Sequence, residues 1–83
     1  MVIEAIISGP EHVGLRLRKA RRDKGLTQQQ LATEAGTNQA VIQKIENGFS
    51  LRPRNIMQIA EVLKVNPAWL QFGEPWSVKE PPK

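Results

Sequence analysis

Two short amphipathic segments joined by a single glycine constrain this chain more than any other feature. Thr27 precedes the first segment and Gln30 follows three residues later, the spacing of a capping box that begins an α-helix. Gly36 ends this segment, because glycine readily adopts the left-handed backbone that a sharp turn requires. Asn38 is then placed to cap a second helix, which ends at Asn47. The sequence therefore predicts two short helices joined by a tight turn.

Similar start and stop signals place three more helices around this pair. Pro10 suits the first turn of a helix, and apolar residues recur at helical spacing from there to a stop at Gly25. Pro53 marks the start of a fourth helix, and Asn66 with Pro67 begins a short fifth one. No stretch alternates between apolar and polar residues as a half-buried strand does. The predicted fold class is therefore all-α, a compact five-helix bundle.

Each predicted helix carries apolar residues on one face, and together these faces form the expected core. Ala32 stands where the second and third helices cross, and its small side chain permits a close approach. The expected core residues are Val13, Leu17, Ala20, Leu31, Ala32, Ala35, Ile42, Ile45, Ile56, Ile59, Ala60, Leu63 and Trp69.

The chain divides into a central domain and two flanking segments. Residues 11–73 carry the predicted helices, residues 1–10 form an N-terminal extension, and the Pro-rich residues 74–83 form a flexible tail. The extension is apolar from Val2 to Ile7, and four interpretations of it remain open. It adds an element to a dimer, it packs across the fifth helix, it is only loosely packed, or it includes residues foreign to the natural chain. The tail either leads to a second, dimerising domain or ends a small protein, and the length of 83 residues favours the second interpretation.

Composition argues against several classes of protein. The chain has no cysteine and a single histidine, His12, so we predict no disulfide, no metal site and no cofactor. It has no histidine paired with a carboxylate at a telling spacing and no phosphate-binding glycine loop, which argues against an enzyme. The longest apolar run, Val2 to Ile7, is too short to cross a bilayer and lacks the pattern of a secretory signal. We therefore expect a cytoplasmic protein with no membrane partner.

Charge is more informative about the partner. Twelve basic residues oppose eight acidic ones, for a net charge of +4, which fits a polyanionic partner, although many other proteins are equally basic. Six of the twelve basic residues fall between Arg16 and Lys24, on the first predicted helix. This run by itself is equally consistent with a nucleic-acid-binding surface and with a solvated helix face.

The second and third predicted helices form a helix-turn-helix. The exposed face of the third helix is polar and nearly free of acidic residues, and such a helix fits the major groove of DNA, where amides and amines hydrogen-bond base edges. The alternative is a generic helical hairpin in a small bundle. The residues expected on this face are Gln39, Ala40, Gln43, Lys44 and Asn47.

Longer motifs are more specific than this spacing. They are Gly25-Leu26-Thr27-Gln28 with Leu31-Ala32, Gly36-Thr37-Asn38-Gln39, Ile45-Glu46-Asn47-Gly48, Arg52-Pro53-Arg54 and Trp69-Leu70. With them, the chain resembles the lambdoid phage repressor and Cro family, within the wider group of Xre-type helix-turn-helix proteins, over roughly residues 13 to 73. The resemblance implies five helices, a homodimer on a palindromic double-stranded DNA operator, and control of transcription, with repression as the expected sign.

The resemblance also implies roles for individual residues. Gln28 would hold a phosphate and steady Gln39, whose amide would read an adenine through two hydrogen bonds. Ala40 would touch a thymine methyl group and Lys44 would donate to guanine; close family members carry glutamine at both positions, so the operator should differ from theirs. Arg54 would face a narrowed minor groove. The full set of implied DNA-binding residues is Gln28, Asn38, Gln39, Ala40, Gln43, Lys44, Asn47, Arg52 and Arg54.

Two implied roles concern the protein itself. Arg21 and Glu46 match a family pair that joins the first helix to the end of the third, so we expect a partly buried ion pair there. Pro67 and Leu70 are the expected contact between two monomers, and Asn47 and Arg52 lie either on the DNA backbone or near this seam.

Three more basic residues, Arg16, Arg18 and Lys19, match no motif. For them a solvated helix face is favoured over base reading.

The same fold also serves as a protein-interaction module in antitoxins and bridging factors. Such a protein would bind a toxin or a polymerase through its flanking segments, for instance through the apolar stretch Val2 to Ile7. A DNA-binding dimer would instead place two copies of the third helix in successive major grooves, about 34 Å apart. It would block polymerase sterically, or assist it from a site just upstream of the promoter.

Overall fold

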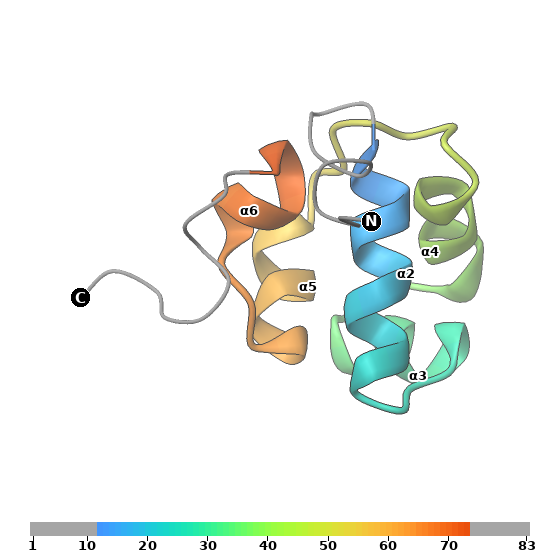
Figure 1. The fold of residues 1–83 in the computed structure, drawn as a ribbon. Coiled ribbons are helices and arrows are strands. Elements are labelled where there is room, and N and C mark those ends of the chain that lie inside the picture. Colours follow the sequence, from blue (N-terminus) through green and yellow to red (C-terminus); the bar gives the residue numbers. More distant parts are fainter. Residues whose placement is uncertain (1–11, 74–83) are drawn as a thin grey trace.

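Five α-helices follow one another along residues 12–73, the part of the chain that the computed structural model describes. No strand occurs among these residues, and none of their helices has the length and apolarity needed to cross a membrane. The prediction of an all-α, five-helix fold is therefore confirmed. The predicted extension (1–10) and tail (74–83) lie outside the described residues. The helices are α2 (Val13–Asp23), α3 (Gln28–Glu34), α4 (Gln39–Glu46), α5 (Ile56–Leu63) and α6 (Pro67–Phe72) (Figure 1).

Side-chain caps make the predicted starts of three helices, α3, α4 and α6. The Thr27 hydroxyl accepts from the backbone N–H of Gln30 at 3.0 Å, and the Gln30 side-chain carbonyl accepts from the Thr27 N–H at 2.8 Å. Asn38 caps α4 and Asn66 caps α6, where its carbonyl accepts from two backbone N–H groups at 2.7 and 3.1 Å. Gly36 has φ +76, as the turn between α3 and α4 requires. These local signals were sufficient to place both helices of the central pair.

The start of α5 differs from the prediction, and the predicted start of the first helix at Pro10 lies outside the described residues. α5 begins at Ile56 rather than at Pro53, because Pro53 is buried and Arg54 and Asn55 form a turn. Helical hydrogen bonding begins only when the Asn55 carbonyl accepts from Ile59 N–H at 3.0 Å. Proline fixes its own φ at a helical value, but it does not oblige the following residues to continue a helix.

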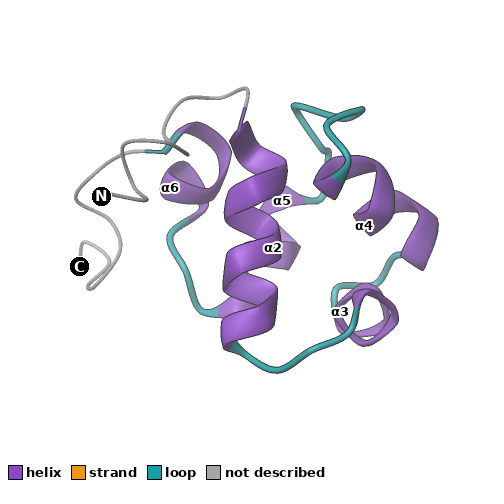
Figure 2. Ribbon diagram, turned by 45° about the vertical axis from the view of Figure 1, so that its right-hand side comes forward, coloured by secondary structure: helices purple, strands orange, loops and turns teal. Residues whose placement is uncertain are grey.

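The core lies where α2 passes between α6 on one side and the α3–α4 pair on the other (Figure 2). The predicted core residues are buried, except that Ile56 and Trp69 are only partly covered against the rest. α2 and α4 approach backbone to backbone at Gly14: a Cβ there would collide with the Ile45 carbonyl oxygen and lie 2.9 Å from that of Glu46. Nothing in the sequence analysis singled out Gly14.

The structure corrects the prediction that Arg16 faces solvent. Its side chain is fully buried, and its Nε and Nη2 donate to the carbonyls of Leu70 and Gln71, each at 2.9 Å. The last turn of a helix leaves carbonyls without intrahelical donors, and its dipole attracts a cation. Arg16 therefore joins α2 to the C-terminal end of α6. The side chain of Gln71 in turn donates to the Leu51 carbonyl at 2.6 Å, which ties the segment between α4 and α5 to α6.

Candidate nucleic-acid interface

α4 presents one continuous polar surface to solvent. Its inward face is formed by Ile42, Ile45 and Glu46, all buried, and Val41 is half-buried against the core. The remaining positions are exposed, as the sequence predicted, and none is acidic: they are Gln39, Ala40, Gln43, Lys44 and, at the C-terminal cap, Asn47. We name these five residues the α4 outer face. Asn38, the N-terminal cap, is also exposed at its edge.

Two glutamines connect this face to a buried carboxylate. Gln39 Nε2 donates to Gln28 Oε1 at 3.3 Å, and Gln28 Nε2 donates to Glu46 Oε1 at 3.1 Å. An ionised carboxylate only accepts hydrogen bonds, so Glu46 fixes which end of the Gln28 amide faces it. The carbonyl of Gln28 is then turned toward Gln39. Gln39 retains its own carbonyl oxygen and one amide hydrogen for other partners.

The buried carboxylate is held by cations from α2. Arg21 donates to Glu46 through Nε at 2.7 Å and through Nη2 at 3.1 Å, so the predicted pair is present. Arg18, which the sequence analysis assigned to a solvated face, also donates to Glu46 through Nε at 3.3 Å. Arg21 further donates to the Leu26 carbonyl at 2.8 Å, which holds the connection from α2 to α3. These bonds join α2 to α4 and to the segment that leads into α3.

These partners decide the ionisation of Glu46. Burial by itself raises the pKa of this carboxyl, because a charge is costly away from water. The hydrogen bonds from Arg21 and Gln28, the charge of Arg21 and the hydrogen bond from Arg18 outweigh burial, and the pKa of Glu46 lies below its ordinary value of 4.5. Glu46 is therefore ionised at neutral pH and acts purely as an acceptor toward Gln28.

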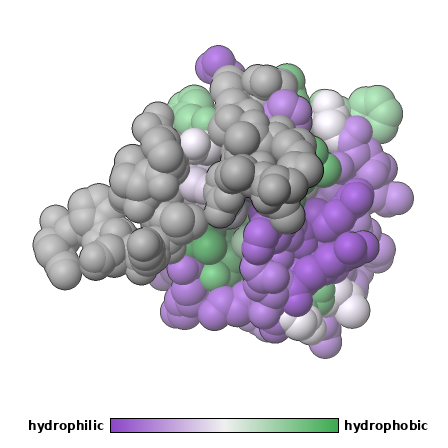
Figure 3. Space-filling model, viewed as in Figure 1, coloured by the Kyte–Doolittle hydropathy of each residue, from purple (hydrophilic) through white to green (hydrophobic). Residues whose placement is uncertain are grey.

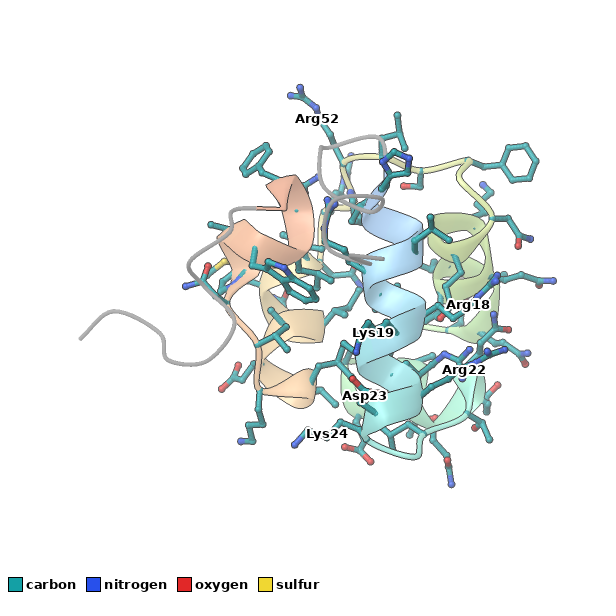
Figure 4. The ribbon with its side chains drawn as sticks, in the orientation of Figure 1. Arg18, Lys19, Arg22, Asp23, Lys24 and Arg52 are labelled. Carbon is teal, nitrogen blue, oxygen red and sulfur yellow. The ribbon has the colours of Figure 1, made fainter. Side chains whose placement is uncertain are left out.

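Charged side chains lie on two sides of α2 and its C-terminal cap. Arg18 and Arg22 lie on the side of α2 that faces α3 and α4, whereas Lys19, Asp23 and Lys24 lie on its other side (Figure 4). Lys19 donates to Asp23 at 2.9 Å across an exposed helical turn, which fits the solvated face expected for Lys19. Where Figure 3 shows residues 12–73, the surface over the C-terminal part of α2 and the adjoining α3 and α4 is mostly hydrophilic.

Two further predicted residues lie beyond α4. Arg52 is exposed and points outward past the N-terminal end of α2 (Figure 4). Arg54 is exposed in the turn before α5 and lines a hollow together with Lys44. The structure thus places Arg54 beside Lys44 of the α4 outer face. Arg52 precedes Arg54 by two residues in the same connecting segment.

The predicted contact between monomers needs one correction. Leu70 is fully buried in the core of a single chain, so its side chain is not available to a second copy. Pro67 is half-buried and lines a surface depression with Met57 and Val65. Met57, at 61% exposure, is the large apolar side chain that this surface offers instead of Leu70.

Four residues that support the site were missed by the sequence analysis or misassigned: Gly14, Arg16, Arg18 and Gln71. A signal existed for Arg16, which lies three residues after Val13 and four before Ala20, on the apolar stripe of α2. Its charge was read as solvent exposure, although the position belongs to the buried face. For Gly14 and Gln71 the sequence carries no comparable signal.

A turn of the observed geometry between two short helices, with the second helix exposed, defines a helix-turn-helix domain. The helix-turn-helix family pattern matches residues 17–70, so the chain belongs to this family, of the Xre or Cro/C1 type. This confirms the resemblance drawn from the motifs.

Similar proteins include named regulators. The chain is 38% identical over 65 residues to the HTH-type transcriptional regulator PrtR of Pseudomonas aeruginosa, covering 78% of this chain and 25% of that protein. It is 46% identical over 59 residues to the HTH-type transcriptional regulator for conjugative element SXT of Vibrio cholerae, which covers 71% of this chain and 27% of that protein. The chain thus spans about a quarter of the length of these relatives.

Similar solved structures match nearly their whole length. The N-terminal DNA-binding domain of SinR from Bacillus subtilis is 26% identical with a TM-score of 0.69, over 72% of this chain and 90% of that one. The restriction-modification controller protein C.AhdI from Aeromonas hydrophila is 32% identical with a TM-score of 0.66, over 74% of this chain and 90% of that one.

Proposed function

We propose that this chain is a sequence-specific DNA-binding domain of a transcriptional regulator, which inserts α4 into the major groove. The observation that carries the proposal is the chain of hydrogen bonds from Glu46 through Gln28 to Gln39, at the start of an exposed helix face without acidic residues. A helix of this width enters the major groove, where side-chain amides pair with base edges. The named regulators among the relatives and the DNA-binding domain of SinR support the same function.

The orientation of Gln39 selects one base. Adenine presents an N6 amino donor and an N7 acceptor in the major groove, and a glutamine amide pairs with both. Gln39 has already donated one amide hydrogen to Gln28, which leaves its carbonyl for N6 and its second N–H for N7. Because Glu46 orients Gln28, the pairing of Gln39 with adenine is prepared before DNA binds.

The other predicted contacts complete the interface. Ala40 contacts a thymine methyl, Gln43 reaches base edges from the same face, and Arg54 enters the minor groove. Gln28, Asn38, Asn47 and Arg52 bind the sugar-phosphate backbone, which supplies affinity without reading sequence. No catalytic step forms part of this function, and it is exercised in the cytoplasm.

A palindromic operator requires two copies of the domain. Two α4 helices would lie in successive major grooves about 34 Å apart on one face of the duplex. Pro67 and the exposed Met57 form the apolar surface on which we place the contact between the two copies, since Leu70 is buried. A dimer bound over a promoter blocks polymerase, so repression is the proposed sign of control.

Selection of bound duplexes from a random pool tests this function. We expect enrichment of a two-fold symmetric site with half-sites about one helical turn apart. Gln39→Ala should relax the preference at one base pair of each half-site. The matched control is Gln29→Ala, which removes an exposed amide of α3 that donates to Thr33. An absence of enrichment above salt-sensitive background would reject the proposal and favour a protein partner, such as a toxin or a polymerase.

A further inference from the structure

A hollow lies between α4 and the segment that leads to α5. Val41 and the buried Pro53 contribute its apolar lining. The remaining residues that line it are polar or cationic and include no aspartate or glutamate: Thr37, Lys44, Ser50, Arg54 and Asn55. The two cations come from different elements, Lys44 from the last turn of α4 and Arg54 from the turn before α5.

Lys44 belongs to the hollow rather than to the centre of the α4 outer face. Successive residues of an α-helix are about 100° apart, so Lys44 is turned about 140° around the axis from Gln39 and only about 60° from Val41. Val41 is half-buried and lines the same hollow, which lies to one side of the glutamines. Lys44 therefore lies between Val41 and Ala40, about 40° around the axis from Ala40, at the edge of the α4 outer face that borders the hollow shared with Arg54.

Two cations with hydroxyl and amide neighbours and no carboxylate suit an anion. A lysine ammonium is a compact, strongly hydrated charge on a flexible stem, which binds a phosphate oxygen as a point charge. In a duplex one sugar-phosphate strand separates the major groove from the adjoining minor groove. α4 in the one and Arg54 in the other would therefore have that strand between them, at the hollow that they border.

We infer that this hollow seats the sugar-phosphate strand and that Lys44 binds one of its phosphates instead of reading guanine. The inference rests on the proposed function and changes the role that the sequence implied for Lys44. Lys44 then contributes affinity at every sequence, and base choice remains with Gln39, Ala40 and Gln43.

The test compares Lys44→Ala with the wild-type chain on the selected duplex and on variants of each base pair. Lys44→Ala should lower affinity about tenfold on all of these duplexes, leave the preferred sequence unchanged, and reduce the slope of log affinity against log salt by about 1. Lys24→Ala is the charge-matched control, because it removes an exposed cation on the far side of α2 (Figure 4). It should leave the slope unchanged.

Neutral phosphates locate the contact. Each phosphate of the selected duplex is replaced singly by a methylphosphonate. One of these replacements should lower the affinity of the wild-type protein for the duplex and leave the affinity of Lys44→Ala unchanged. Two results would together overturn the inference and leave the proposed function standing. Lys44→Ala would change the sequence preference at one base pair, and every methylphosphonate would lower the affinity of Lys44→Ala as much as that of the wild-type chain. Failure of the wild-type chain to select any site would overturn both.

Discussion

The side-chain amide of Gln28 donates to the buried carboxylate of Glu46 at 3.1 Å, and this bond links the stability of the fold to the geometry of the α4 outer face. Glu46 is at once the acceptor for Arg18 and Arg21 and the group that orients Gln28. The stabilising ion pairs and the proposed base recognition therefore share one carboxylate. Substitutions around it separate the two roles.

Gln28→Ala should weaken discrimination without removing the side chain that contacts the base. Gln39 loses its partner at 3.3 Å, and its amide becomes free to present either end to the groove. We expect the preference for adenine at that position to fall by about 1 kcal/mol, the net contribution of one hydrogen bond. Competition between the selected duplex and a duplex altered at that base pair measures this. If Gln28→Ala weakens both duplexes equally, Gln28 contacts only the backbone.

Stability should fall with acid in a window that Glu46 defines. The pKa of Glu46 is lowered in the folded chain, so the folded state binds this proton less readily than the unfolded state does. The stability that ionised Glu46 contributes is complete above its ordinary pKa of 4.5 and is lost as the pH falls through the lower, folded value. Melting temperatures of the wild-type chain and Glu46→Gln across this range measure the effect. The variant should melt lower at neutral pH and show the shallower decline with acid; parallel curves would contradict the assignment.

Gly14→Ala should destabilise the fold although alanine favours a helix. The added methyl group meets the carbonyl oxygens of Ile45 and Glu46, which belong to the backbone and do not rotate away. Overpacking costs about 1–3 kcal/mol and the gain in helix propensity is about 1 kcal/mol, so a net loss of about 1 kcal/mol is expected. Urea unfolding measures it. The control Leu15→Ala changes an exposed neighbour on the same helix, and equal stability of Gly14→Ala and wild type would show that the helices separate easily.

Arg16→Met should loosen the end of α6. The substitution keeps much of the side-chain volume but removes the donors to the carbonyls of Leu70 and Gln71, which then stay buried without them. We expect the free energy of unfolding to fall by about 2–4 kcal/mol. Relative to the wild-type chain, hydrogen exchange should accelerate more in α6 than in α3. Arg22→Met, at an exposed position of the same helix, should change stability by less than about 0.5 kcal/mol. An equally small effect at both positions would remove the structural role of Arg16.

Local signals determined most of what the sequence predicted correctly. The caps at Thr27, Asn38 and Asn66 and the turn at Gly36 depend on residues within one or two helical turns, so the sequence alone located the central helix pair and its exposed face. Pro53 was the exception, because its fixed φ is compatible with a turn as well as with a helix.

Only the tertiary structure decided how distant residues share the interior. Arg16 was read as solvated because charged side chains are usually exposed, yet its partners at Leu70 and Gln71 lie 54 and 55 residues away. The burial of Leu70 and the contact at Gly14 depend in the same way on which helices pack together. Local hydrogen bonds set the helices, whereas the burial of each side chain depends on surfaces that the chain brings together only when it folds.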